Sequence, residues 1–324
     1  MGGRLEKEIK ARESMEVRLN TLPPIFSEFY HWLDARERSY TTMKNYINHV
    51  VEFMNFYTKN KRKDDFYLYV TDIDIEKYLT SLRRKVVDGK EVELGDSIRA
   101  TKWSSLNTFF KFLSNRKYIE TNPMVLTERP KLRTENEVVY LTQDEIESVF
   151  KRITSESKDV FKNRDLCIVA MGLGTGLRVS AIVNIDIEDI DFSTNTIRVI
   201  EKGRKIRQIK FANNLRNALL AWIKDREIYF DGGTEGPLFL SQKKTRMAIN
   251  TVLNLVKKYT SHLSKHITPH KLRSSAAMNL HGAGVDILTI ASILGHENIT
   301  TTQRYTRAFD EDKKEATNIL DSLI

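Results

Sequence analysis

Cysteine, proline and glycine are scarce in this sequence of 324 residues. It contains one cysteine, Cys167, together with 6 prolines and 14 glycines. A lone thiol cannot form an internal disulfide, which excludes the disulfide-stapled class of secreted proteins and favours a reducing compartment. So little proline and glycine excludes a collagen-like chain, and 40% hydrophobic residues predict order over nearly the whole length.

Long hydrophobic runs are also missing. No segment reaches the roughly 18 apolar residues that a membrane-spanning helix needs. The first residues, MGGRLEKEIKARESMEV, mix charges of both signs where a signal peptide needs an apolar stretch. The sequence therefore predicts a soluble, cytoplasmic protein that has no membrane partner.

Several common catalytic patterns are absent. The sequence has no cysteine-rich or HExxH zinc pattern, no G-x-S-x-G elbow and no P-loop. His266 and His270 stand four residues apart, but no glutamate follows the first. The glycines at 172, 174 and 176 read G-x-G-x-G after a predicted helix, whereas a dinucleotide fold needs G-x-G-x-x-G after a strand. We therefore expect neither a metal ion nor another cofactor.

Positive charge is in excess. Lysine and arginine total 52 against 43 acidic residues, a formal charge of +9, which favours a polyanionic partner such as nucleic acid. The excess is concentrated between residues 95 and 133. Such a cluster is either a solvated helix face or a surface that follows a phosphate backbone, and its density favours the second. The DNA contacts expected on this basis are Arg99, Lys102, Lys111, Arg116, Lys117, Lys131 and Arg133.

Hydrophobic periodicity predicts two helical domains. Residues 1–21 are a charged lead-in, and 22–127 form an all-helical domain whose aromatic residues at helical spacing we assign to its core. The polar, aperiodic segment 128–140 is the expected linker. A second domain at 141–308 and an amphipathic helix at 309–324 follow. Helices are expected at 24–35, 41–57, from 74, from 97, at 142–153, 159–170, 213–229, 246–259, 269–281, 286–294 and from 300.

Strands are expected in one place only. Residues 196–200 and 206–211 are rich in β-forming residues and flank Lys202-Gly203, which predicts a hairpin. The expected fold class is therefore mainly α with a small antiparallel β-sheet. A capping box at Thr142 to Glu145 marks the start of the second domain's first helix.

A set of cations and one tyrosine occurs in a suggestive order in the second domain. Arg178 stands in GTGLRVS, Lys202 in EKGRKIR, His270 and Arg273 in HKLR, and His296 and Tyr305 in LGHENITTTQRYT. With these motifs, from about residue 22 onward, the chain resembles the tyrosine recombinases of the Xer and phage-integrase family. The spacings of 24 residues from Arg178 to Lys202 and of 9 from His296 to Tyr305 agree with the Xer pattern.

The resemblance implies a two-domain clamp around duplex DNA, with a core-binding domain followed by a catalytic domain. It further implies site-specific recombination through a 3′-phosphotyrosine and a Holliday junction, by a protein that is a monomer when free and a homo-tetramer on paired DNA sites. Such a protein would be associated with the nucleoid. By the same resemblance, segment 309–324 docks into a neighbouring protomer, with docking on its own domain as the alternative.

The chemistry of these residue types agrees with the implied reaction. A tyrosine oxygen can attack a phosphodiester and conserve its energy as a phosphoester, which suits Tyr305. Guanidinium groups such as those of Arg178 and Arg273 can stabilise the transition-state charge. Lys202 can protonate the departing 5′ oxygen. The resemblance assigns His270 to the tyrosine proton or the phosphate and His296 to hydrogen-bonding support.

One position departs from the family pattern. Ala181 stands where the family usually has an acidic residue after R-[IV]-S. We regard that acid as a supporting group, so its absence puts the orientation of Arg178 in question and leaves the reaction class intact. Asp186, Glu188 and Asp189 are the nearby candidates to replace it.

Two other functions remain open at this point. A type IB topoisomerase uses a similar centre of cations and one tyrosine but acts as a monomer and rejoins the same ends. A DNA-binding regulator that has lost catalysis would share the fold, although the complete set of six residues argues against it.

Overall fold

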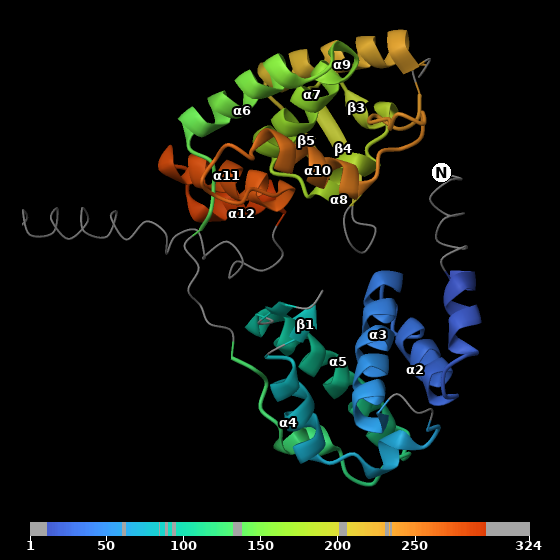
Figure 1. Ribbon diagram of the computed structural model, residues 1–324. Coiled ribbons are helices and arrows are strands. Elements are labelled where there is room, and N and C mark those ends of the chain that lie inside the picture. Colours follow the sequence, from blue (N-terminus) through green and yellow to red (C-terminus); the bar gives the residue numbers. More distant parts are fainter. Residues whose placement is uncertain are drawn as a thin grey trace, which may run out of the picture. The chain divides into compact units, whose positions relative to one another are not determined.

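The computed structural model describes residues 12–59, 63–83, 85–87, 90–92, 95–131, 138–200, 206–230, 233 and 235–295. The chain divides into two compact units, Met1–Glu135 and Asn136–Ile324 (Figure 1). The division falls inside segment 128–140, the expected linker. The expected helices at 309–324 and from 300, and most of the lead-in, lie outside the described residues.

The first unit is helical. Its helices begin at local signals in the sequence: the Ser39 hydroxyl accepts a hydrogen bond from the Thr42 amide, and Thr71 and Asp74 form a capping box. Residues 12–19 are helical as well. The other elements are α2 (Ile25–Asp34), α3 (Tyr40–Thr58), η1 (Phe66–Tyr69), α4 (Asp72–Ser81), β1 (Lys85–Val87), β2 (Lys90–Val92), α5 (Asp96–Asn115) and η2 (Pro123–Leu126).

Aromatic side chains build the core of this unit. Phe109 of α5 is fully buried, and its ring centroid lies 5.1 Å from that of Phe29 and 6.0 Å from that of Phe26, both on α2. Phe66 of η1 completes the cluster at 6.2 Å from Phe109. The assignment of these regularly spaced aromatic residues to the core is confirmed.

The second unit surrounds a small sheet with helices. Strands β3, β4 and β5 form an antiparallel sheet in that order, with Ile197 paired to Ile209 and Val199 to Arg207. Ile197, Val199 and Ile209 bury their side chains in the core. The elements are α6 (Gln143–Glu156), α7 (Asp159–Thr175), α8 (Val179–Asn184), η3 (Ile187–Asp189), β3 (Ile190–Asp191), β4 (Thr196–Ile200), β5 (Ile206–Lys210), α9 (Asn213–Phe230), α10 (Ile249–Tyr259), α11 (Pro269–Gly282) and α12 (Ile287–Leu294). The predicted fold class, mainly α with a small antiparallel sheet, is confirmed.

The predicted end of the helix at 159–170 is wrong. Helix α7 continues to Thr175, so Gly172 and Gly174 lie within it. A Cβ built on Gly172 would lie 3.1 Å from the Leu272 side chain of α11, so this glycine allows close helix packing. Only Gly176 acts as the glycine of a turn.

The prediction of a single pair of strands is also wrong. The structure adds the short strand β3 to the sheet and a second hairpin, β1 and β2, in the first unit. These strands have two or three residues each, too few to show an alternating pattern in the sequence.

Candidate active site

Arg178 lies where α7 passes into α8. Helix α7 ends at Thr175, and the next residue, Gly176, has a left-handed φ of +61°. A Cβ on Gly176 would lie 2.4 Å from Cδ2 of Leu294. Glycine therefore permits both the turn and the close approach of α12. Arg178, two residues later, is the N-cap of α8, and its carbonyl accepts a hydrogen bond of 2.8 Å from the amide of Ala181. Its side chain is exposed, where an anion can reach it.

Arg273 joins this turn to the end of α12. The side chain comes from α11 and is 1% exposed. One terminal nitrogen donates to the carbonyl of Gly176 and the other to the carbonyl of Leu294, each at 2.7 Å. The first carbonyl lies two residues before Arg178, and the second two residues before His296. Arg273 thus ties together two segments that lead into predicted catalytic residues.

A second arginine contacts the same end of α12. Arg207 of β5 donates from one nitrogen to the carbonyls of Ser292, at 3.0 Å, and Ile293, at 2.8 Å. Three successive carbonyls in the last turn of α12 are therefore bound by two arginines. Arg207 is the last residue of the EKGRKIR motif, where nothing in the sequence separates it from the other basic residues of the hairpin.

The remaining predicted catalytic residues divide into two groups. His270 is exposed in the first turn of α11, three residues before Arg273, so both come from one helix. Lys202, His296 and Tyr305 lie outside the described residues. The structure thus places Arg178, His270 and Arg273 and brings the turn before Arg178 against the end of α12.

The nearby acids have partners other than Arg178. Asp186 accepts a hydrogen bond from Arg246. Glu188 accepts from the amide of Gly236, at 3.0 Å, and Asp189 binds the guanidinium of Arg198, with 2.8 Å between Oδ1 and the nearer terminal nitrogen. Each carboxylate therefore has a structural contact of its own.

The predicted DNA contacts in and after α5 differ in exposure. Lys111, Arg116, Lys117 and Lys131 are exposed, and Arg133 lies outside the described residues. Lys102, in contrast, is 6% exposed and its ammonium binds Glu52 of α3. Arg99 is bound to Asp96 at 2.8 Å and has a side chain 12% exposed.

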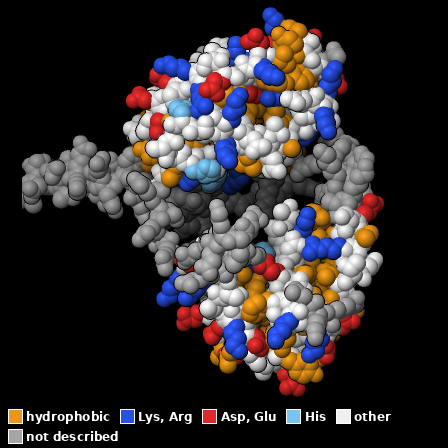
Figure 2. Space-filling view, in the orientation of Figure 1, with side chains coloured by type: hydrophobic (Ala, Val, Ile, Leu, Met, Phe, Trp, Pro, Cys, Tyr) orange, Lys and Arg blue, Asp and Glu red, His pale blue; other side chains and the backbone are white. Residues whose placement is uncertain are grey.

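Helix geometry explains this difference. Nine residues separate Lys102 from Lys111, a rotation of about 180° around a helix. One side of α5 faces the core, so the two lysines cannot share a surface. Lys102 is therefore corrected from a DNA contact to a buried partner of Glu52. Figure 2 shows lysine and arginine side chains interspersed with acidic ones on the visible face of each unit.

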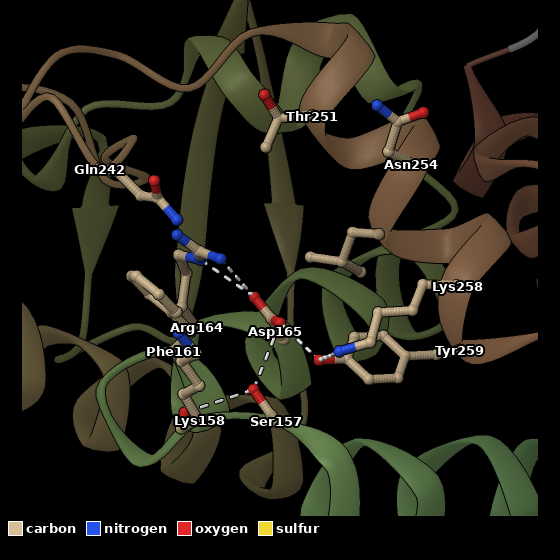
Figure 3. A pocket seen from close by; sticks show the side chains of 11 residues that line it. Ser157, Lys158, Phe161, Arg164, Asp165, Gln242, Thr251, Asn254, Lys258 and Tyr259 are labelled. Carbon is tan, nitrogen blue, oxygen red and sulfur yellow. Dashed lines mark hydrogen bonds and ion pairs between the residues drawn. The ribbon is translucent and has the colours of Figure 1, made fainter.

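A pocket of about 310 Å³ lies among α7, α10 and the loop after α9, and its lining contains none of the predicted catalytic residues (Figure 3). Its centre is Asp165, which is 5% exposed. One carboxylate oxygen binds the Arg164 guanidinium, at 2.8 and 3.0 Å, and the other accepts from the Tyr259 hydroxyl, at 2.9 Å. Burial raises the pKa of Tyr259, which keeps this donor protonated. Arg164, Asp165 and Tyr259 thus form a hydrogen-bonded cluster that holds α7 against α10.

The cluster carries a stability prediction. Asp165→Ala should lower the free energy of unfolding of the second unit by about 3–5 kcal/mol, because it leaves the Arg164 charge buried without its carboxylate. Asp159→Ala is the control, since it breaks an exposed pair with Lys162 on the same helix and should change stability little.

The measurement is urea denaturation, monitored by tryptophan fluorescence, in a protein that also carries Trp32→Phe and Trp103→Phe. Trp222 is then the sole tryptophan and reports on the second unit, where it is fully buried. Equal midpoints for the Asp165 and Asp159 variants would contradict the structural role of the cluster.

Two general features of the described part of the chain bear on the site. There, no group of three or more His, Cys, Asp or Glu side chains could hold a metal ion. Within the same residues, no helix combines the length and the apolar character that crossing a membrane requires.

Similarity to known proteins covers nearly the whole chain. The model of the phage integrase family matches residues 139–312. Tyrosine recombinase XerC of Caldanaerobacter subterraneus subsp. tengcongensis is 33% identical, with 96% of this chain and 90% of the relative covered. Tyrosine recombinase XerC of Syntrophus aciditrophicus is 32% identical, with 87% and 92% covered.

Solved structures share the fold. The XerH site-specific recombinase, solved with a palindromic difH substrate, matches with a TM-score of 0.68 at 19% identity, covering 89% of this chain and 82% of that one. The Tn1549 transposon integrase, solved with a circular intermediate DNA, matches with a TM-score of 0.67 at 21% identity, covering 91% and 99%. The family match and the XerC identities show that this chain belongs to the phage integrase family of tyrosine recombinases.

Proposed function

We propose that this enzyme is a site-specific recombinase that cleaves and rejoins double-stranded DNA at paired recombination sites, through a 3′-phosphotyrosine on Tyr305 and a Holliday junction. It needs neither metal nor ATP, because the tyrosyl phosphoester conserves the energy of the broken bond. The observation that carries the proposal is the bridge made by Arg273. Its two bonds of 2.7 Å hold together the turn before Arg178 and the end of the helix that precedes His296.

The proposed roles follow from charge and exposure. Arg178, exposed at the start of α8, contacts the non-bridging oxygens of the scissile phosphate. Arg273 is 1% exposed, so its charge acts on the phosphate from below the surface. The low dielectric there strengthens the attraction between the guanidinium and the phosphate.

Proton transfer falls to the other members of the set. Lys202 protonates the departing 5′ oxygen, and His270, exposed on the helix that carries Arg273, receives the tyrosine proton or binds the phosphate. His296 supports the phosphate by hydrogen bonding. These assignments rest on the matched motifs of the family.

The proposed assembly is a monomer in free solution and a homo-tetramer on DNA. In this scheme, segment 309–324 docks into the neighbouring protomer and couples the nucleophile of one subunit to the state of the next. The enzyme works in the cytoplasm, on the nucleoid.

Strand exchange separates this function from the alternatives. A recombinase exchanges strands between two duplexes that carry the site and assembles as an oligomer on them. A type IB topoisomerase would relax supercoiled DNA as a monomer and rejoin the original ends, and an inactive regulator would bind without cutting. Incubating the protein with two distinguishable duplexes, built from the site recovered from cells, tests the proposal: recombinant products support it, and relaxation or binding alone contradicts it.

Salt dependence tests the proposed DNA surface on α5. The logarithm of the binding constant should fall steeply with the logarithm of salt concentration, with a slope of several units, since each neutralised phosphate contributes about 0.9. Replacing the exposed Lys111 by glutamine should reduce the slope by about one unit. Lys102→Met is the matched control, because this residue of the same helix is buried and bound to Glu52.

The measurement is duplex affinity from low to moderate salt for the wild type and both variants. A flat salt response would place the positive charge away from DNA. An equal change of slope for the two variants would contradict the orientation of α5.

A further inference from the structure

The end of α12 is held by side chains as well as by its own backbone. The last four carbonyls of a helix lack partners within it, and the helix dipole gives that end a partial negative charge. In α12, Arg207 binds the carbonyls of Ser292 and Ile293, and Arg273 binds that of Leu294. Two cations are therefore placed where both hydrogen bonding and charge favour them.

Gly295 makes the contact with Arg207 possible. It ends α12 in the left-handed conformation, with a φ of +67°. A Cβ at this position would lie 2.8 Å from the central carbon of the Arg207 guanidinium and 2.9 Å from one of its nitrogens. The guanidinium thus packs against the backbone of Gly295, and any side chain there would displace it.

The contact between Arg207 and the end of α12 lies close in sequence to two predicted catalytic residues. Arg207 follows Lys202 by five residues, at the start of β5, and its neighbour across the sheet is the buried Val199 of β4. Gly295 directly precedes His296. The contact therefore links the strand that follows one predicted catalytic residue to the helix end that precedes another.

We propose that Arg207 is a positioning residue for strand cleavage. Its guanidinium fixes the end of α12 against β5, so that the chain segments leading to Lys202 and to His296 keep a constant relative position. Arg207 supplies no proton and touches no substrate in this proposal. This role rests on the proposed function. It adds Arg207, a residue of the hairpin, to those that the proposed cleavage requires.

Arg207→Met removes the donors and keeps most of the side-chain stem. Single-turnover cleavage should slow by on the order of 10²-fold, the scale that a misplacement of about 1 Å costs a reacting group. DNA affinity should be unchanged. Arg207→Lys should cleave at an intermediate rate, because an ammonium can bind a carbonyl but cannot reproduce the planar fork. The substrate is a nicked suicide duplex containing the site recovered from cells.

Arg198→Met is the matched control. Arg198 lies on the neighbouring strand β4 and binds Asp189 through two nitrogens, at 2.8 and 3.0 Å, with its side chain 51% exposed. It makes an equally well-formed contact away from α12. Its loss should leave cleavage and binding unchanged.

Hydrogen exchange supplies a readout that does not depend on activity. The Gly295 amide donates to carbonyls of α12, and this last turn should open more often without Arg207. Exchange at Gly295 should be roughly tenfold faster in Arg207→Met, the scale of one lost charge-assisted hydrogen bond, and unchanged in Arg198→Met.

The outcomes separate this inference from the proposed function. If the wild type forms a covalent adduct and Arg207→Met forms it equally fast, the positioning role is wrong. If the wild type forms no adduct, the proposed function fails, and unchanged exchange at Gly295 would independently overturn the contact's role. Should the methionine variant not fold, Arg207→Lys carries the test: slower cleavage with normal affinity supports the proposal, and wild-type cleavage overturns it.

Discussion

Tyr305→Phe is expected to bind DNA with wild-type affinity and to form no covalent protein–DNA adduct. The substitution keeps the ring and its packing and removes only the oxygen that attacks phosphorus. Affinity is measured by duplex binding at fixed salt, and adduct formation by denaturing electrophoresis after incubation with a nicked suicide duplex.

Tyr229→Phe is the control for this experiment. Tyr229 is on α9 and is 47% exposed, so loss of its hydroxyl should affect neither binding nor adduct yield. A normal yield of adduct from Tyr305→Phe would remove this residue from the nucleophile's role. Loss of DNA binding would show that the hydroxyl serves the interface or the fold.

Lys202→Ala is expected to slow cleavage of ordinary DNA by roughly 10²–10⁴-fold, the usual contribution of general acid catalysis. Much of the loss should disappear on a substrate in which sulfur replaces the 5′ bridging oxygen, because a thiolate leaves without receiving a proton. Single-turnover rates on the two substrates provide the measurement.

Lys210→Ala controls for the loss of a cation near the same hairpin. Lys210 is exposed at the far end of β5 and should show similar rates on both substrates. If Lys202→Ala is equally impaired on oxygen- and sulfur-containing DNA, its role lies outside protonation of the leaving group.

Local signals in the sequence predict most of the helices. The capping box at Thr142 and Glu145 marks the start of α6, where the structure contains both reciprocal hydrogen bonds. The periodic apolar residues of segment 41–57 correspond to α3, with Met43, Ile47 and Val50 fully buried. Such features act within one or two helical turns, so they can be recognised without the tertiary structure.

Features that depend on packing are not predictable in this way. A basic cluster along α5 cannot show that Lys102 faces Glu52 of another helix, fifty residues earlier in the chain. Gly172 belongs to a glycine-rich stretch that predicts a turn, but in the structure it lies within α7 and allows close packing against Leu272 of α11. Arg207 likewise gains its role from carbonyls 85 and 86 residues away in sequence.

The family motifs predict the catalytic set residue by residue. The structure adds how Arg178 and Arg273 are held: one exposed at a helix start, the other buried and bonded to two carbonyls. That arrangement depends on the left-handed Gly176 and on its contact with Leu294. A motif records which residues recur, whereas their burial and partners depend on three-dimensional packing.

Peptide mass spectrometry of the trapped complex tests the central claim most directly. The wild-type enzyme is incubated with a nicked suicide duplex, the DNA is digested with nuclease, and the tryptic peptides are mapped for a residual nucleotide. The account predicts a nucleotide joined through its 3′-phosphate to Tyr305 and to no other residue. A nucleotide on a different side chain, or one attached through its 5′-phosphate, would contradict it.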